Sequence, residues 1–318
     1  MKDEFDDLLS ILQDDDQPLP VARLKELSDL DSTHLSRLRT AWSSIPDKRR
    51  QRLIVELGRL ADRSIEVTFE RVNRFAMGDH LPEIRRRAIQ NLWECDDLAL
   101  AQPLMTVLCE DASAEVRAAA AAALGPYVFL GETEEIPAEL LHRIEEALLG
   151  AYASDSAQAV RVSCLESLGY SSREEIPELI RSAYASGVEE VMRSALCAMG
   201  RSADDPWSPM VLAELTSASP ALRLEAARAA GELELREAVP GLIDLLEDVH
   251  DDVRRAAIWS LGELGGDEAK AALARLAEEA KDEAEAALLE EALQNLDFVD
   301  GTHDLFLFNL DEPGDLST

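Results

Sequence analysis

The chain has 318 residues, of which 47% are hydrophobic and 5% are aromatic, and its formal net charge at pH 7 is −33. Ala, Leu, Glu and Arg dominate most of its length, and because these residues favour helices over strands, we expect an all-α protein. A body this acidic repels nucleic acids and anionic lipid surfaces, so neither nucleic acid nor a membrane is an expected partner.

Residues 1–47 are predicted to form N-terminal capping helices. Four apolar residues recur there at helical spacing: Phe5, Leu8, Leu9 and Leu12. A further helix is expected to begin near Ser32 or Thr33. The first residues lack the basic stretch and long apolar core of a secretory signal, and no apolar run reaches the ~20 residues of a membrane span. We therefore expect a cytoplasmic protein.

Basic residues concentrate near the N-terminal end. Residues 34–87 hold thirteen Lys or Arg against seven Asp or Glu, whereas acidic residues outnumber basic ones in the rest of the chain. Two interpretations stay open for this section. It is either a solvated, arginine-rich helix face or a local basic patch on an acidic body.

A ten-residue frame recurs along the chain. Its eight copies begin at Arg49, Ile84, Val116, Val160, Val191, Leu222, Val253 and Ala284. The last five copies follow one another at intervals of 31 residues. Positions one, five, six and nine are apolar in most copies, and this spacing places them on one face of a helix. Each frame therefore predicts one helix.

Three positions in and around the frame predict how the helices pack. Position five is small in the six central copies, which indicates a closely packed neighbour: Ala88, Ala120, Cys164, Ala195, Ala226 and Ala257. Position ten is glycine in six copies, interpreted as a left-handed helix cap: Gly58, Gly125, Gly169, Gly200, Gly231 and Gly262. A proline suited to a first helical turn stands 13 or 14 residues before four frames: Pro103, Pro177, Pro209 and Pro240. Each unit is therefore expected to be a helix pair that buries its apolar face only by stacking.

The frames "DVRRAAIWSLGELG" and "EVRAAAAAALG", with the preceding segment "EAVPGLIDLL", resemble HEAT repeats of the short bilin-lyase-like subclass. The resemblance covers about residues 48–296. It implies an α-α superhelix, a HEAT-like α-solenoid of about eight helix pairs, whose second helices line the concave side. It also implies that arginine at frame position two joins a polar ladder between repeats: Arg50, Arg85, Arg117, Arg161, Arg223 and Arg254. Met192 interrupts this series, and Arg193 follows it.

The pattern is irregular at two places within residues 48–296. The segment Gly125–Glu139 contains an insertion, which we expect to lengthen a turn or the following first helix, and which could also carry a binding function. Trp93 replaces the position-ten glycine in the second frame and indicates an irregular junction.

Residues 297–318 form an acidic, aromatic-rich C-terminal tail with little helical pattern. Its candidate docking residues are Phe298, Leu305, Phe306, Phe308 and Leu310. Two interpretations stay open. The apolar side chains either pack on the last repeat, or they form a docking peptide for a partner or for the chain's own groove.

No catalytic, metal or cofactor site is expected. The four cysteines show no metal-binding spacing and are expected to be free and buried in helices. The deoxyhypusine hydroxylase branch of HEAT proteins binds di-iron through His-Glu pairs, but none of the five histidines here is followed by Glu. No HExxH, GxSxG or Walker motif is present. We therefore predict that the chain is not an enzyme.

If second helices line a groove, frame positions three, four, seven and eight should point into it. The candidate protein-binding residues at these positions are Arg86, Arg87, Arg193, Leu224, Arg228, Arg255 and Trp259. Arg and Trp often anchor protein interfaces. The predicted function is a scaffold or adaptor whose groove holds an acidic, hydrophobic protein segment, from a partner or from its own tail. The alternative is a subunit of a bilin-lyase-like or other modifying enzyme complex.

Overall fold

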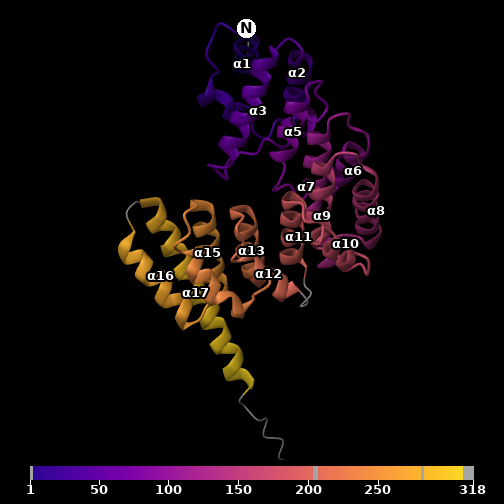
Figure 1. Ribbon diagram of the computed structural model, residues 1–318. Helices are drawn as coiled ribbons and strands as arrows, with labels where there is room; N and C mark the ends of the chain where they lie inside the picture. Colours follow the sequence, from indigo (N-terminus) through magenta and orange to yellow (C-terminus); the bar gives the residue numbers. More distant parts are fainter. Residues whose placement is uncertain (1–2, 203–206, 281–282, 311–318) are drawn as a thin grey trace, which may run out of the picture. The chain divides into compact units, whose positions relative to one another are not determined.

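The computed structural model describes residues 3–202, 207–280 and 283–310, with side chains described as far as residue 299. These residues form helices and contain no strand, which confirms the predicted all-α class. The helices are stacked in pairs, as in an α-solenoid (Figure 1). The predicted division into a cap, a solenoid and a tail stays a prediction.

The chain divides into two compact units, Met1–Ser167 (unit 1) and Leu168–Thr318 (unit 2). Unit 1 opens with α1 (Glu4–Gln13), the 3₁₀ helix η1 (Val21–Leu27), α2 (Ser32–Trp42) and α3 (Asp47–Ala61). The four apolar residues predicted for the first helix are buried, and the second helix begins at Ser32 as predicted. The Asp31 carboxylate caps α2 by accepting the N–H groups of Thr33 and His34, both at 2.8 Å.

Two arginines of the basic section are buried. Arg49, only 5% exposed, donates to the backbone carbonyls of Gln17, Ile11 and Pro18 at 2.6, 2.9 and 3.2 Å. The guanidinium group thereby attaches the N-terminal helix to α3. Arg50 is 2% exposed. The interpretation as a wholly solvated arginine face is wrong for these two residues, because helix packing encloses their side chains.

The rest of unit 1 continues the helix pairs. Its elements are α4 (Glu70–Ala76), α5 (Pro82–Gln90), η2 (Leu98–Leu100), α6 (Ala101–Glu110), α7 (Ala114–Glu132), α8 (Ala138–Ser154) and α9 (Gln158–Leu168). Helices α4 and α5 form one pair and α6 and α7 the next, and the second helices α3, α5 and α7 pack side by side.

The insertion at Gly125–Glu139 is accompanied by two long helices. Helix α7 continues through Pro126 as far as Glu132, which was not expected, and the following first helix α8 has 17 residues, which agrees with the expected lengthening of a first helix. Tyr127 and Val128 are buried on α7, and this apolar face favours helix despite the missing N–H of the proline.

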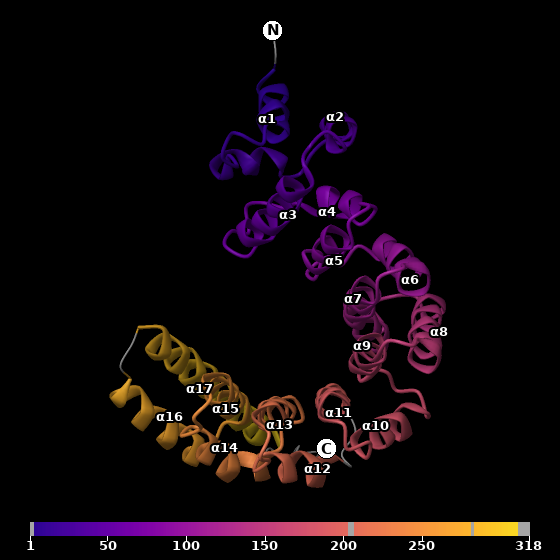
Figure 2. The ribbon, with the colours of Figure 1, turned by 45° about the horizontal axis from the view of Figure 1, so that its top comes forward.

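Unit 2 consists of two layers of helices. The first layer holds α10 (Ile176–Tyr184), α12 (Ser208–Glu214), α14 (Val239–Leu245) and α16 (Asp267–Glu279). The second holds α11 (Glu189–Arg201), α13 (Pro220–Glu232), α15 (Asp251–Leu264) and α17 (Glu283–Leu310). Figure 2 shows α11, α13, α15 and α17 side by side, each paired with a helix of the first layer. Pro177, Pro209 and Pro240 lie in first turns, as predicted.

The position-ten glycines do not cap helices in the left-handed conformation. Five of them lie inside helices and Gly169 directly follows α9, and none has a positive φ. They allow neighbouring second helices to approach. A Cβ at Gly231 would lie 2.8 Å from Ser260 Oγ, and one at Gly262 would lie 3.0 Å from the Ala292 carbonyl oxygen. The predicted cap is therefore wrong, whereas the six small position-five residues are fully buried as predicted.

Arginine at frame position two forms the expected ladder. Arg223 donates two hydrogen bonds to the Asp248 carboxylate, at 2.6 and 3.0 Å, and a third to the Ser217 carbonyl at 2.8 Å. Asp248 also accepts the N–H of His250 at 2.9 Å, and its carbonyl accepts from Arg254 at 2.8 Å. Equivalent rungs join Arg85 to Asp111 and Arg117 to Asp155. Each rung therefore links one repeat to the next.

These contacts hold the pKa of three ladder carboxylates below the ordinary value. The hydrogen bonds from Arg117 are the main cause for Asp155, and those from Arg223 for Asp248. Burial alone would raise the pKa of Asp111, but the neighbouring guanidinium and a backbone N–H outweigh it.

We expect the Asp248→Asn substitution to lower the free energy of unfolding by about 1–2 kcal/mol at neutral pH, and by progressively less as the pH falls below the unfolded-state pKa of Asp. The folded-state pKa of Asp248 is depressed. Its contribution is therefore complete above the unfolded value of about 3.9 and is lost as the pH falls through the folded value. Urea unfolding followed by circular dichroism across this pH range measures the difference between the two proteins. A difference that stayed constant at low pH would contradict the role of the charged carboxylate.

Candidate functional site

The second layer of unit 2 presents a surface that we call the Arg–Trp face. It consists of five of the residues predicted from the sequence: Arg193, Leu224, Arg228, Arg255 and Trp259. They come from frame positions three and seven of α11, α13 and α15, and all are exposed or half-buried. The Arg228 side chain is 53% exposed and Trp259 is 40% exposed. Side chains one helical turn apart thus follow one another along one side of the layer.

A buried carboxylate organises two of these arginines. Glu225 is 4% exposed, and its Oε1 lies 3.1 Å from Arg228 Nη1 and 3.8 Å from Arg193 Nη1. Arg228 belongs to the same helix as Glu225, whereas Arg193 lies on the preceding second helix. A carboxylate that is removed from water is stabilised by such paired cations. Glu225 therefore fixes both guanidinium groups at the junction of α11 and α13.

Trp259 lies against α13. A Cβ added to Gly231 would come within 2.8 Å of the Trp259 ring atom Cζ3, so the glycine provides the space that the indole occupies. Arg228 precedes Gly231 by three residues, which places it one helical turn away on the same helix. The indole therefore contacts α13 at Gly231, one helical turn from Arg228.

A pocket of about 330 Å³ lies between α15 and α17. Its lining consists of Asp251, Arg254, Arg255, Ile258, Ala284, Glu285 and Leu288. Arg255 thus stands beside an apolar lining that includes the buried side chain of Ile258. The pocket offers a place for one hydrophobic side chain next to a guanidinium group.

The remaining predicted residues lie elsewhere. Arg86 and Arg87 belong to α5 of unit 1, where Arg86 is exposed. Arg87 is half-buried, and a Cβ at Gly58 would lie 2.9 Å from its Nη2, so its guanidinium lies against α3. On α17, Phe298 is 70% exposed. The side chains of the other tail residues lie outside the described residues: Leu305, Phe306, Phe308 and Leu310. The expectation of little helix is wrong as far as Leu310, where α17 ends.

Frame positions four and eight do not point into a groove. In the three second helices that carry the Arg–Trp face, both positions are buried: Ser194, Ala198, Glu225, Ala229, Ala256 and Ser260. These positions turn toward the neighbouring helix, as shown by the hydrogen bond from Ser260 Oγ to the Ala227 carbonyl at 2.7 Å. The prediction was therefore wrong for these two positions. Glu225 was missed for this reason, although a charged residue beside the buried position five was an available signal.

The cysteines are free, as expected, but only Cys164 is fully buried. Its burial raises the pKa of the thiol to about 12, which leaves it unreactive. Cys109 is exposed, and Cys95 follows the end of α5 rather than lying in a helix, so the expectation of four buried helical cysteines is wrong. Within the described ranges, no three or more His, Cys, Asp and Glu side chains gather in a way that could hold a metal ion. No described helix has the length and apolar character of a membrane span.

A family model of HEAT repeats matches residues 208–294, which include α12 to α16 and the first part of α17. Residues 208–294 are HEAT repeats. The resemblance to HEAT repeats is thereby confirmed over residues 208–294, and the Arg–Trp face lies largely within this range. No curated protein sequence matches the chain.

The solved structures that are similar to the chain at low identity include the following three. Human deoxyhypusine hydroxylase, in complex with glycerol, is 17% identical, with 93% of this chain and 96% of that chain covered and a TM-score of 0.39. YibA of Escherichia coli is 16% identical. The match covers 75% of this chain and 95% of YibA, with a TM-score of 0.42. An engineered protein is 18% identical. The match covers 72% of this chain and 96% of the engineered protein, with a TM-score of 0.32.

The prediction that the chain is not an enzyme is corrected. One of these similar structures is an enzyme, deoxyhypusine hydroxylase, and the similarity covers 93% of this chain. At this identity the similarity does not assign an activity to this chain.

Proposed function

We propose that the chain is a protein-binding scaffold whose Arg–Trp face holds an extended acidic segment with hydrophobic anchors. The observation that carries this proposal is the half-exposed indole of Trp259, which lies against α13 at Gly231, one helical turn from the exposed Arg228. Exposed aromatic and arginine side chains on a fixed surface often dominate binding energy. HEAT repeats support a scaffold in general terms, and a cytoplasmic location stays a prediction from the sequence.

The chemistry of the segment follows from the face. Guanidinium groups bind carboxylates in a bidentate manner, which suits Arg228 and Arg255 to Asp or Glu side chains. The pocket beside Ile258 suits an aliphatic or aromatic side chain. Because the whole chain carries a net charge of −33, long-range electrostatics oppose an acidic ligand, and affinity has to come from these local contacts.

Residues 301–318 of the chain have this acidic and hydrophobic composition, and we use this segment as the probe. A fluorescent synthetic peptide of this sequence is titrated into the full-length protein carrying Phe306→Ser and Phe308→Ser, so that its own tail competes less. We expect the further substitutions Arg228→Ala and Trp259→Ala together to weaken binding at least about tenfold.

The matched control is Arg52→Ala, which removes an exposed arginine from α3, a second helix of unit 1. We expect this variant to bind the peptide like the parent protein. Circular dichroism verifies that every variant keeps its helix content. Absence of peptide binding, or equal affinity after loss of Arg228 and Trp259, would remove the proposal.

A further inference from the structure

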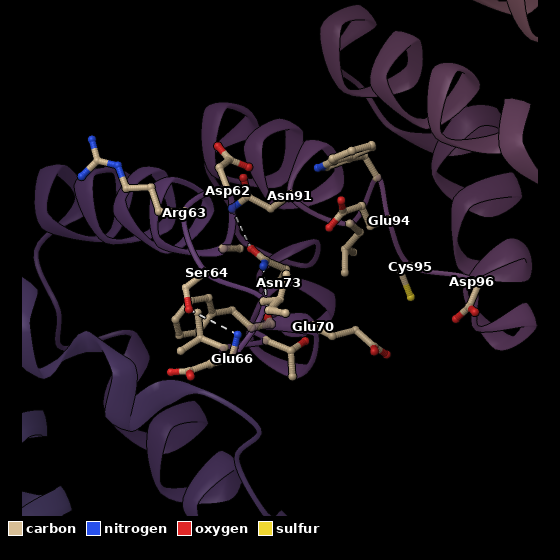
Figure 3. A pocket seen from close by; sticks show the side chains of 17 residues that line it. Asp62, Arg63, Ser64, Glu66, Glu70, Asn73, Asn91, Glu94, Cys95 and Asp96 are labelled. Atoms are coloured by element: carbon tan, nitrogen blue, oxygen red, sulfur yellow. Dashed lines mark hydrogen bonds between the residues drawn. The ribbon is translucent and has the colours of Figure 1, made fainter. Parts of the chain in front are cut away.

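Unit 1 contains a cleft of about 970 Å³ that is separate from the Arg–Trp face. Its lining consists of the loop after α3, the start of α4 and the residues that follow α5: 61–70, 73 and 91–96. Figure 3 shows these side chains arranged around the cleft. The sequence prediction assigned no function to this region beyond an irregular junction at Trp93.

Two large apolar side chains of the cleft face solvent. Trp93 is 64% exposed, and Ile65 is fully exposed. Trp93 takes the place of the position-ten glycine, which in other frames meets the next second helix. Here α5 ends at Gln90, and Trp93 lies in the turn that follows. Exposed tryptophan and isoleucine at one cleft are typical of a binding surface, because each would gain roughly 1.5–3 kcal/mol on burial.

The floor of the cleft is held rigidly by two asparagines. Asn91 Nδ2 donates to the Ile54 carbonyl at 2.9 Å and to Asn73 Oδ1 at 3.1 Å. Asn73 is 2% exposed, and its Nδ2 donates to the Phe69 carbonyl at 3.0 Å. These bonds connect α3, α4 and the end of α5, and Figure 3 shows the two amides facing each other. A fixed floor lowers the entropic cost of binding.

The charge of the lining defines the occupant. Five carboxylates line the cleft against one arginine, Arg63: Asp62, Glu66, Glu70, Glu94 and Asp96. Glu70 forms an ion pair with Arg74 at 2.7 Å. In the part of the chain that the structure describes, the other four have no ion-pair partner within 4.0 Å. The cleft is therefore anionic, and the net charge of the chain adds long-range attraction for a cation.

We propose that this cleft docks an extended basic peptide segment in which Lys or Arg residues flank one large apolar side chain. The basic side chains pair with Glu66, Glu94 and Asp96, and one of them can stack on the exposed Trp93 ring. The apolar side chain covers Ile65 and the indole. This partner is opposite in charge to the one proposed for the Arg–Trp face, so the two sites are tested independently.

The probe is a fluorescein-labelled synthetic peptide in which two Lys-Arg pairs flank one leucine, measured by anisotropy with the full-length protein at physiological salt. We expect Trp93→Ala, and separately the pair Glu66→Lys and Glu94→Lys, to weaken binding at least about tenfold. The control Phe129→Ala removes another exposed aromatic side chain of unit 1 outside the cleft, and we expect no change in affinity.

Non-specific attraction of a basic peptide to an acidic protein is controlled by charge reversal elsewhere. The pair Glu278→Lys and Glu279→Lys on α16 changes the net charge by the same amount and is expected to leave the affinity within about twofold. An equal loss in this control, an unchanged affinity for Trp93→Ala, or no binding by the parent protein would each overturn the proposal. Arg228→Ala with Trp259→Ala is expected to leave this binding unchanged, which separates it from the Arg–Trp face.

Discussion

Replacing Asp79 with Asn is expected to lower the free energy of unfolding by about 3 kcal/mol. The side chains of Asp79 and Arg50 are only 1% and 3% exposed, with Asp79 Oδ2 3.3 Å from Arg50 Nε. Asp79 also accepts from Trp42 Nε1 at 2.6 Å and from the N–H of Leu81 at 2.9 Å. The amide keeps the shape of the carboxylate but leaves the buried guanidinium without its buried counter-charge. Urea unfolding followed by circular dichroism gives the difference.

The matched control is Asp47→Asn, because Asp47 pairs with the same arginine. Its oxygen lies 2.8 Å from Arg50 Nη2, closer than that of Asp79, but its side chain is 58% exposed. Water screens this pair and can replace the lost carboxylate, so we expect a cost below about 1 kcal/mol. If Asp47→Asn cost as much as Asp79→Asn, burial would not be what decides the strength of the Arg50 pairs.

Replacing Gly200 with Ala is expected to destabilise unit 2 by about 2–3 kcal/mol, although alanine is the better helix former. Gly200 lies inside α11. A Cβ at this position would lie 2.9 Å from the Cα and 3.3 Å from the Cβ of Ala229 on α13, and would also meet the Glu232 carboxylate. Because a backbone atom blocks the added methyl group, α11 and α13 have to move apart. Thermal unfolding followed by circular dichroism measures the loss.

Gly150→Ala provides the opposite result within the same chain. Gly150 lies inside α8, and a Cβ there would meet no atom within 4 Å. We expect this substitution to stabilise the protein by about 0.5–1 kcal/mol through helix propensity alone. A Gly200→Ala variant that was also stabilised would show that neighbouring second helices are not packed this closely.

These glycines also show where prediction from the sequence reached its limit. The apolar spacing within each frame predicts a helix, because spacing is a local property of one helix face. The role of a glycine near the end of a frame depends on a helix that lies about 30 residues further along the chain. Gly231 meets Ser260 and Trp259, and no local pattern distinguishes this contact from a helix cap. Helix α15 is capped not by Gly262 but by Gly265, where φ is +66°.

The Arg–Trp face was predictable in part. Frame positions three and seven lie at the surface in α11, α13 and α15, because they lie opposite the apolar stripe, although Val162 at position three of an earlier frame is buried. Positions four and eight lie at the edge of that stripe, where the angle between adjacent helices decides exposure, and here they are buried. The anionic cleft was not predictable, because its lining comes from loops after two helices. In the sequence, only the replacement of the position-ten glycine by Trp93 indicated that this region is irregular.

The junction between α11 and α13 differs mechanically from the others that have an Arg–Asp rung. Met192 and Ser217 stand where the rungs described above have an arginine and an aspartate, so the junction between α11 and α13 has no Arg–Asp rung at these positions. The cross-helix ion pair is found on the Arg–Trp face instead, between Arg193 and Glu225. A ligand carboxylate that paired with Arg193 would therefore break its ion pair with Glu225. Helices α11 and α13 would then move more easily relative to each other. Under the proposed function, ligand binding would therefore change the stiffness of the array at this junction.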